Sequence, residues 1–365
     1  MNNGPQRVRF GIIGGGWRAA FYLRAARECP AHFEVAGVAV RDGTKGAALE
    51  QAWGIPTYRT PAEMLEKRTP EFVVVSVPWP VTPVMLKLLA EREMPALCET
   101  PPAPDLPGLL EVAALAAGGA RIQVAEQYQF QPLHAARLAL LASGKLGRIT
   151  QAQVSSCHGY HGVSLIRKYL DVHFETVTIR ARRFTSPIVK GPTRAGPPAE
   201  EKIADSVQTI AWLDFGDRLG VYDFAGAQYM SWIRAPRVLL RGERGEIVDK
   251  TVRYLKDFET PLAFELVRSD AGPDGNLEGH YHKGILAGDS WAYRNPFVGA
   301  RLTDDELAVA TCLAGMSGYV REGTSFYDVA EACQDHYLGV LIDESAESGT
   351  LVTSTAQPWT APRGQ

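Results

Sequence analysis

The chain has 365 residues, a length that accommodates two domains with a cleft between them. Hydrophobic residues make up 45% and charged residues 22%, and the formal net charge at pH 7 is -3, so charge gives no reason to expect nucleic acid or an acidic membrane as a partner. Five scattered cysteines without a C-x-x-C motif argue against a disulfide framework and favour a reducing compartment. The first nine residues lack the apolar core of a signal peptide, and no apolar run approaches the roughly 20 residues that cross a bilayer, so we expect a cytoplasmic protein.

Short apolar runs alternate with helical patterns over the first 125 residues, which predicts a parallel α/β sheet. Thr60, Pro61 and Glu63 supply an N-cap, an N1 proline and an N3 acid, so a helix is expected to begin there. The run 71–77 is rich in β-branched residues and is typical of a strand that is buried on both faces. Further strands are expected at 8–13, 33–40, 96–99 and 121–125, and helices at 17–28, 84–91 and 106–117.

The pattern changes after Pro132, where a helix at 133–143 is followed by longer, partly alternating strands. These features predict a second α/β domain with a large mixed or antiparallel open sheet, and they divide the chain into domains at 5–128 and 129–360. The segment 187–198 is expected to be a loop. Two late helices are indicated by the pairs Thr303 with Glu306 and Ser325 with Asp328. The strands are expected at 149–157, 174–184, 206–215, 219–225, 237–241 and 246–249.

A glycine-rich turn follows the first predicted strand and opens the first helix. Gly14, Gly16 and Ala19 fit the pattern G-x-G-x-x-A, with Trp17 and Arg18 between the last two. In this pattern the first glycine permits a tight turn, the second lets the backbone approach a pyrophosphate, and the small third residue lets helix and strand pack closely. The βαβ context predicts a Rossmann domain that binds a dinucleotide.

The end of the second strand bears on the choice between NAD and NADP. An acid is expected there to bind the ribose 2′-hydroxyl, but the sequence reads Val40, Arg41 and Asp42. Val40 has no polar side chain, whereas Arg41 can bind a 2′-phosphate, which favours NADP. The alternative is that Arg41 is a solvated loop residue and that Asp42 caps the next turn.

Several segments follow one another in an order and at a spacing that a known family shares, and these are 11–19, 72–78, 99–101, 127–132, 145–149, 161–170, 242–245 and 344–349. Through them the chain resembles the Gfo/Idh/MocA family of sugar and polyol dehydrogenases. The resemblance covers nearly the whole chain. It implies an N-terminal Rossmann domain, a C-terminal domain whose open sheet carries substrate and often an oligomer contact, and hydride transfer between a carbohydrate hydroxyl carbon and NAD(P). We therefore expect a carbohydrate or polyol substrate and a homodimer or homotetramer.

Three departures from the family pattern concern the catalytic half of the site. The family usually has Glu-Lys-Pro where this chain has Glu99-Thr100-Pro101, and Thr100 carries no charge that could replace the ammonium. The family often places an Asp three residues before or after its substrate-side His, whereas here His161 is flanked at these spacings by His158 and Ser164. A histidine that the family often has in the third βα loop is replaced by Thr82.

A base that accepts a hydroxyl proton is needed for hydride transfer from a carbinol, and a neutral imidazole has a suitable pKa. His161 is the first choice, from its residue type and from the family position that it occupies, and Tyr160 stands beside it. The resemblance places Glu99 in the nicotinamide pocket, where it serves either catalysis or loop structure. Lys168 is a remote candidate to replace the missing lysine.

The remaining candidates are expected to contact cofactor or substrate. Pro78, Trp79 and Thr100 are assigned to the cofactor, with Trp79 as a flat wall or simply as a packing residue. Gln127, Tyr128, His158 and Ser164 are assigned to the substrate.

Two other interpretations stay open beside the dehydrogenase. One is a lyase or glycosidase that oxidises its substrate transiently and returns the hydride to it, and the other is a dinucleotide-binding protein without catalysis. No metal site is expected, because no acid or cysteine stands at a matching distance from His280 and His282.

Overall fold

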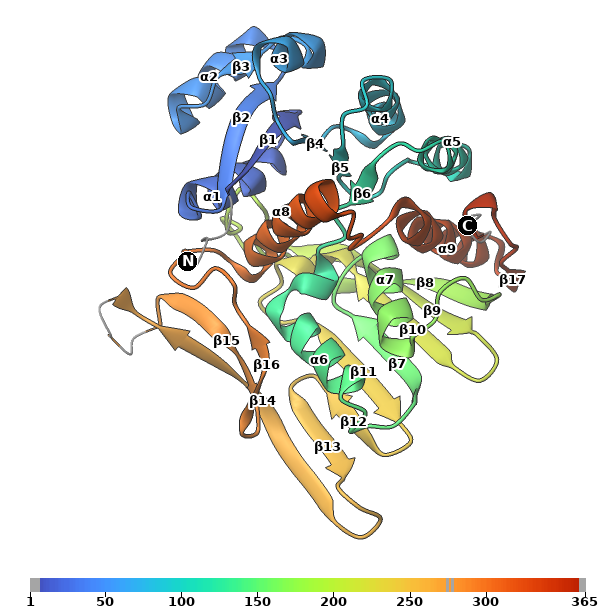
Figure 1. Ribbon diagram of the computed structural model, residues 1–365. Helices are drawn as coiled ribbons and strands as arrows, with labels where there is room; N and C mark the ends of the chain where they lie inside the picture. The colour runs from blue at the N-terminus through green and yellow to red at the C-terminus, as the bar shows by residue number, and fades with distance from the viewer. Residues whose placement is uncertain (1–6, 274–275, 277–278, 361–365) are drawn as a thin grey trace.

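The strands of the N-terminal half form a parallel sheet, in agreement with the buried β-branched pattern. The computed structural model describes residues 7–273, 276 and 279–360 (Figure 1). Among these residues, six strands form the first sheet in the order β3-β2-β1-β4-β5-β6, which is the Rossmann order. Its strands are β1 (Val8–Ile13), β2 (Phe33–Ala39), β3 (Thr57–Tyr58), β4 (Phe72–Val75), β5 (Ala96–Cys98) and β6 (Ile122–Val124).

One helix of this domain begins where its capping residues predict it, and another was not predicted at all. Helix α3 (Pro61–Lys67) has Thr60 as its N-cap, and the Thr60 side chain accepts a hydrogen bond from the backbone N–H of Glu63. Helix α2 (Gly43–Trp53) was not expected, and its N-cap is Asp42, which accepts from the N–H of Lys45. The other helical segments are α1 (Ala19–Glu28), η1 (Trp79–Val81), α4 (Thr82–Ala90), α5 (Leu106–Ala117) and η2 (Tyr128–Phe130).

A larger mixed sheet forms the second domain and confirms the predicted fold class. In the described chain it contains eleven strands in the order β16-β15-β14-β13-β12-β11-β7-β10-β9-β8-β17. The pair β7 and β10 is parallel, and the other paired neighbours are antiparallel. The strands are β7 (Ile149–Ser155), β8 (Thr178–Val189), β9 (Ile203–Asp214), β10 (Leu219–Ala225), β11 (Arg237–Gly242), β12 (Gly245–Val248), β13 (Thr251–Leu255), β14 (Pro261–Ala271), β15 (Tyr281–Ala287), β16 (Ser290–Arg294) and β17 (Val352–Thr353).

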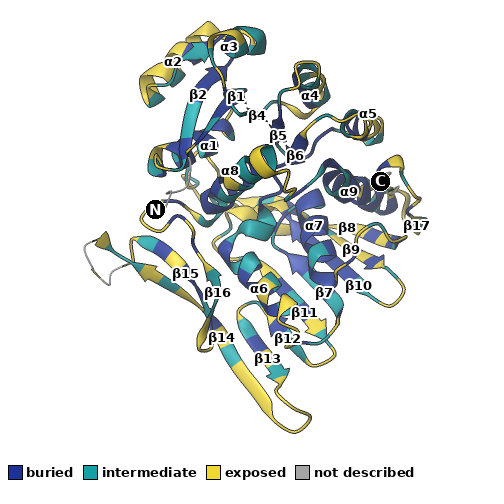
Figure 2. Ribbon diagram, viewed as in Figure 1, coloured by how far each residue is buried: buried dark blue, intermediate teal, exposed yellow. Residues whose placement is uncertain are grey.

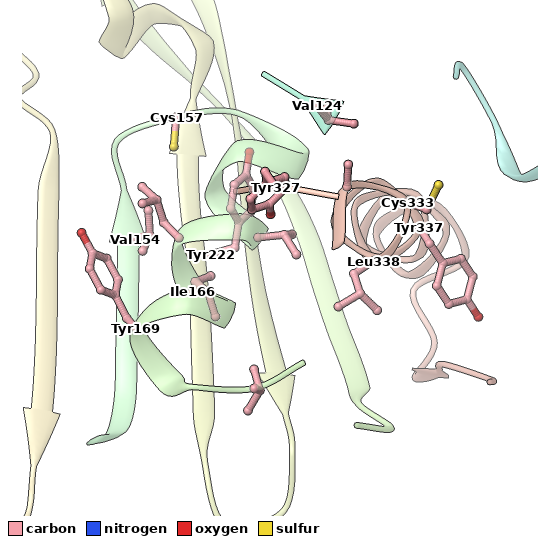
Figure 3. Packing of buried hydrophobic residues seen from close by; sticks show 14 of the residues in the cluster. Val124, Val154, Cys157, Ile166, Tyr169, Tyr222, Tyr327, Cys333, Tyr337 and Leu338 are labelled. Atoms are coloured by element: carbon pink, nitrogen blue, oxygen red, sulfur yellow. The ribbon is translucent and has the colours of Figure 1, made fainter. Parts of the chain in front are cut away.

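Helices α7 (Gly159–Leu170) and α9 (Val329–Ser348) cover one face of this sheet and are largely buried (Figure 2). Figure 3 shows Ile166 and Tyr169 of α7 and Leu338 of α9 among the buried side chains of this layer. The remaining segments are α6 (Pro132–Ala142), α8 (Asp304–Glu322), η3 (Gly226–Tyr229) and η5 (Pro358–Thr360).

Helix α8 belongs to the second half of the chain but packs on the first domain. Its buried Leu307 and Leu313 share a hydrophobic core with Tyr22 and Leu23 of α1. Residues from beyond 300 therefore help to position the glycine turn that precedes α1. Each of the five cysteines lies in the described part of the chain, where it is buried and free. No helix in the described ranges has the length and apolarity that a membrane span requires.

Several predicted boundaries in the second domain were wrong, and two of them are instructive. Strand β8 continues through Pro187 to Val189, where a loop was expected. Beyond its two-residue contact with β17, β8 has β9 on one side only, so the missing N–H of Pro187 breaks no ladder on its open edge. The last long helix is capped by Asp328 rather than by Ser325, whose hydroxyl donates to Oε1 of Gln123.

Candidate active site

A cavity of about 1800 Å³ runs from the glycine turn to the start of α7 and is lined by both domains. It begins at the carboxyl ends of parallel strands, where ligands bind in open α/β sheets. The structure brings almost all of the predicted site residues to its wall. These are Gly14, Gly16, Trp17, Arg18, Arg41, Pro78, Trp79, Glu99, Thr100, Gln127, Tyr128, His158, Tyr160 and His161.

The glycine turn has the geometry that a dinucleotide requires. Gly14 has φ +107°, and a Cβ there would lie 1.9 Å from the carbonyl oxygen of Ser76, so only glycine fits. A Cβ on Gly16 would meet no atom within 4 Å, which leaves open space above the backbone at the N-terminal end of α1. Ala19 does not line the cavity; it is buried as the first residue of α1, which agrees with a packing role. The turn therefore fits a pyrophosphate.

The far end of the cavity is basic. Val40 is buried, whereas Arg41 is exposed, and Lys45 and Arg59 line the same end. The carboxylate of Asp42 caps α2, and the hydrogen bond from the Lys45 backbone N–H lowers the pKa of Asp42. The carboxylate of Asp42 is thus engaged in capping α2, while Arg41, Lys45 and Arg59 line the cavity.

Arg18 supplies a fixed positive charge next to the position of the missing lysine. Its Nε lies 2.8 Å from Oε1 of Glu99, and its Nη1 lies 2.9 Å from Oδ2 of Asp305 in the first turn of α8. Nη2 of Arg18 is buried and has no hydrogen-bond partner among the described residues. Lys168, the other candidate cation, does not line the cavity and lies 3.7 Å from Glu331.

His161 is paired with a buried carboxyl group. Its Nδ1 lies 2.7 Å from Oε2 of Glu126, which follows β6 and is almost inaccessible. Burial raises the pKa of Glu126 to about 8. Burial and the positive charge of Arg18 lower the pKa of His161 to about 3, so its imidazole is neutral at pH 7. No hydrogen bond to Nε2 of His161 is formed within the described residues, which leaves this atom available to a ligand.

Polar aromatic side chains surround His161. The hydroxyl of Tyr160 donates to the carbonyl oxygen of Thr100 over 3.4 Å and lies 3.3 Å from Nε2 of His158. Burial raises the pKa of Tyr160, so this phenol stays protonated and acts as a hydrogen-bond donor. Burial also lowers the pKa of His158 to about 4, with a further contribution from His161. The Tyr128 ring lies 4.5 Å from the His161 ring, and Tyr229 contacts His158.

Ser164 does not join the site, although it was expected to contact substrate. It lies one turn further along α7 than His161, is fully buried, and its hydroxyl lies 3.0 Å from that of Tyr327. Because the helix runs away from the cavity, a spacing of three residues carries the side chain into the core. Thr82 does line the cavity, and Trp79 forms a partly exposed wall against Tyr160.

Several residues of the site were missed in the sequence, among them Glu126, Asp305 and Tyr229. Glu126 comes directly after a buried parallel strand, and this position is a usable signal for a ligand-binding polar residue. Asp305 and Tyr229 have no such signal, because each reaches the cavity through tertiary packing alone. Among the described residues no group of three or more metal-ligating side chains occurs, and His282 is buried on β15 with Nδ1 3.0 Å from Asp270.

Comparison with known proteins finds a family and a curated relative whose sequences match part of the chain. The family described as "Oxidoreductase family, NAD-binding Rossmann fold" (Gfo/Idh/MocA) matches residues 8–126. The chain is 31% identical over 151 residues to inositol 2-dehydrogenase 4 of Saccharopolyspora erythraea. This match covers 39% of the chain and 43% of the relative, so less than half of the curated relative is matched.

Solved structures share the fold over almost the full length. A myo-inositol dehydrogenase from Corynebacterium glutamicum has a TM-score of 0.64 at 17% identity, covering 96% of this chain and 100% of that chain. A levoglucosan dehydrogenase in complex with NADH has a TM-score of 0.71 at 16% identity, covering 95% of this chain and 99% of that chain. These likenesses establish the two-domain architecture, including the large sheet.

Proposed function

Because its N-terminal domain belongs to the Gfo/Idh/MocA family of NAD-binding oxidoreductases, we propose that this protein is an NAD(P)-dependent dehydrogenase that acts at a secondary carbinol of a sugar, sugar derivative or cyclic polyol. The relatives that act on inositol and levoglucosan support the substrate class. When bound, the nicotinamide supplies the hydride acceptor or donor. The turn of Gly14 and Gly16 would hold the pyrophosphate of the dinucleotide, and the pocket of Trp79, Glu99 and Thr100 would hold its nicotinamide half.

The observation that carries this proposal is the pairing of His161 with Glu126 at the wall of the cavity. When Glu126 is ionised, it accepts a hydrogen bond from Nδ1–H of His161, and this fixes the tautomer that leaves a lone pair on Nε2. During oxidation Nε2 accepts the hydroxyl proton of the substrate, and the carboxylate stabilises the protonated pair. During reduction the same pair returns the proton.

Arg18 takes over the electrostatic part of the missing lysine. Glu99 and Asp305 hold its guanidinium in place, and its Nη2 is left with an unused N–H donor. Because two carboxylates already bind the guanidinium, its contribution to the negative charge that develops on the substrate oxygen comes from the oriented N–H groups of Nη2 rather than from a net positive charge. Arg18 cannot exchange a proton near neutral pH, so proton transfer falls to His161 alone.

The part of the cavity around His161, which both domains line, suits a neutral ring with several hydroxyl groups. His158 is neutral and Tyr160 is un-ionised, so both form hydrogen bonds without a net charge. The rings of Trp79, Tyr128 and Tyr229 offer flat apolar surfaces to the C–H faces of such a ligand. Gln127 adds a buried amide whose Oε1 has no partner among the described residues.

The test is to incubate the purified protein with NAD or NADP and a panel of inositols and aldoses, and to record absorbance of the reduced nicotinamide. Net reduction that depends on the substrate is expected. His161→Ala should lower kcat by about 100-fold or more, because a general base is lost, while cofactor affinity is unchanged. Turnover by His161→Ala at the wild-type rate would remove His161 from the mechanism. Product without net cofactor change would identify a lyase with transient oxidation, and binding without product a non-catalytic protein.

A further inference from the structure

The connection between β8 and β9 brings the second domain against the glycine turn of the first. Its base is joined by a hydrogen bond from the N–H of Lys190 to the carbonyl of Lys202, over 2.8 Å. Its tip is a tight turn in which the backbones of Thr193 and Gly196 each donate to the other, over 2.9 and 3.0 Å. Arg194 lies within this turn, so the two backbone hydrogen bonds hold the point from which its side chain extends. Pro192, Thr193 and Arg194 all line the cavity.

Arg194 stacks on Trp17, the residue that directly follows Gly16. The guanidinium carbon lies 3.9 Å from the centroid of the indole ring, a close cation–π contact between the two domains. Trp17 is 56% exposed and makes a T-shaped ring contact with Phe21 on α1. A large exposed indole on this turn therefore holds the guanidinium at the wall of the cavity that Gly16 also lines.

The charge of Arg194 is not neutralised by the protein. Its guanidinium forms no ion pair and no hydrogen bond with any described residue. The acids of the cavity are already engaged, since Glu99 and Asp305 bind Arg18, and Asp42 caps α2. The planar N–H fork of arginine matches phosphate oxygens, and the open N-terminal end of a helix favours the same ligand. The local chemistry thus selects an anionic, phosphate-bearing group.

We propose that Arg194 of the second domain binds the pyrophosphate of the dinucleotide together with the glycine turn of the first, with Trp17 as the residue that positions Arg194. The second domain then contributes directly to cofactor affinity, in addition to its substrate side. This inference rests on the cofactor part of the proposed function. It is independent of the substrate and of the proton-transfer step.

The test is calorimetric titration of Arg194→Ala with NAD, ADP-ribose and adenosine, beside the wild type. Loss of charge-assisted hydrogen bonds should raise the Kd of NAD and of ADP-ribose about tenfold or more, with no change for adenosine, which lacks phosphate. Arg301→Ala, at an exposed arginine outside the cavity, is the matched control and should bind all three ligands as the wild type does. Higher salt should weaken NAD binding less in Arg194→Ala than in the wild type.

A double-mutant cycle with Trp17→Ala tests whether Trp17 positions Arg194. If Trp17 acts through Arg194, the two substitutions together should raise the Kd of NAD by less than the product of their separate effects. An unchanged Kd of NAD in Arg194→Ala would overturn the proposal, as would an equal loss for adenosine, which would indicate general damage to the fold. Wild-type protein that binds the dinucleotide without turnover would contradict the proposed dehydrogenase and leave Arg194 in place. Wild-type protein that binds neither NAD nor NADP would contradict both.

Discussion

Glu126 and His161 titrate as a coupled pair, and this gives the proposed reaction a defined pH dependence. Below pH 8 the buried carboxyl group keeps its proton, because burial raises its pKa to about 8, and the pair is then a weak base. Above this pH the carboxylate forms and the pair can accept the hydroxyl proton. We predict that kcat/KM for oxidation rises with pH to a plateau above about 8 and that kcat/KM for reduction falls over the same range. Steady-state kinetics in both directions measures this.

Glu126→Gln is the informative variant, since glutamine keeps the shape but cannot ionise. Its rate of oxidation should be low and should lose the rise near pH 8. Stability provides a second measurement. A carboxyl whose pKa is raised on folding stabilises the native state at low pH, and this contribution is lost as the pH rises through the folded pKa. The Tm of the wild type should therefore fall from pH 6 to 9 more steeply than that of Glu126→Gln. If kcat/KM for oxidation still rises near pH 8 in Glu126→Gln, the prediction that Glu126 and His161 titrate as a pair is wrong.

The basic end of the cavity predicts a preference for the phosphorylated cofactor. Arg41, Lys45 and Arg59 line this end, and Asp42 is engaged as a helix cap. Arg41→Ala should raise the KM of NADP roughly tenfold, since a charge-assisted contact to the 2′-phosphate is lost, and leave the KM of NAD unchanged. Initial rates with each cofactor measure the two values. Equal effects on both cofactors would mean that Arg41 does not contact the 2′-phosphate.

At the scale of single residues, the sequence predicts what is local. The turn of Gly14 and Gly16 is recognisable because its pattern lies within one short segment, although the contact that excludes a side chain at Gly14 is made by the distant carbonyl of Ser76. His161 was found through its residue type and the family position, but its partner Glu126 stands 35 residues earlier in the chain. Asp305 is 287 residues from Arg18. Such pairs form only when the domains pack together, so no local sequence pattern predicts them.

Helix α8 shows how an element positions a distant site residue. Thr303 and Glu306 form a capping box at its start, and Asp305, which binds Arg18, lies in the same first turn. Thr303→Ala should destabilise the protein by about 1 kcal/mol, and the frayed turn should hold Asp305 less firmly. We predict a Tm lower by roughly 1–3 °C together with a lower kcat/KM.

The control for this prediction is Thr311→Ala in the middle of the same helix. Its hydroxyl donates to the carbonyl of Leu307, a bond that the helix does not need, and alanine is the better helix former. Thr311→Ala should thus keep the wild-type Tm and activity, and Thr303→Ser should retain most of both. A Tm that does not change in Thr303→Ala would show that the capping box is not needed.

Capped helices and buried strands were predicted well, while exposed strands were not. Thr60 and Thr303 each announce a helix through an acid three residues later, and 106–117 was predicted with its observed bounds. Four strands between Thr251 and Arg294 were missed. In β14 (Pro261–Ala271) Leu266 is the one buried residue, so neither face carries an apolar pattern that could reveal a strand.

At the scale of the whole molecule, the large sheet has a face on which none of the described helices packs. Strand period places Phe184, Ile210 and Trp212 on the face opposite to buried Ala211 and Leu213, which pack under the helices. Trp212 is 53% exposed and Phe184 54%, and such apolar side chains gathered on one face are typical of a protein interface. We predict that two copies of the chain associate through this face, as a dimer or as part of a tetramer.

Trp212→Glu tests this association. An interface that holds two copies stably covers about 1600 Å² in total, and a charge buried at its centre without a partner is strongly destabilising. Light scattering after gel filtration should give a dimer or tetramer for the wild type and a smaller species for Trp212→Glu. Phe258→Glu is the matched control: Phe258 is 83% exposed at the turn between β13 and β14, and its substitution should leave the mass unchanged. A wild-type monomer at micromolar concentration would contradict the prediction. The family likeness would then extend to the fold of the sheet but not to its use as an interface.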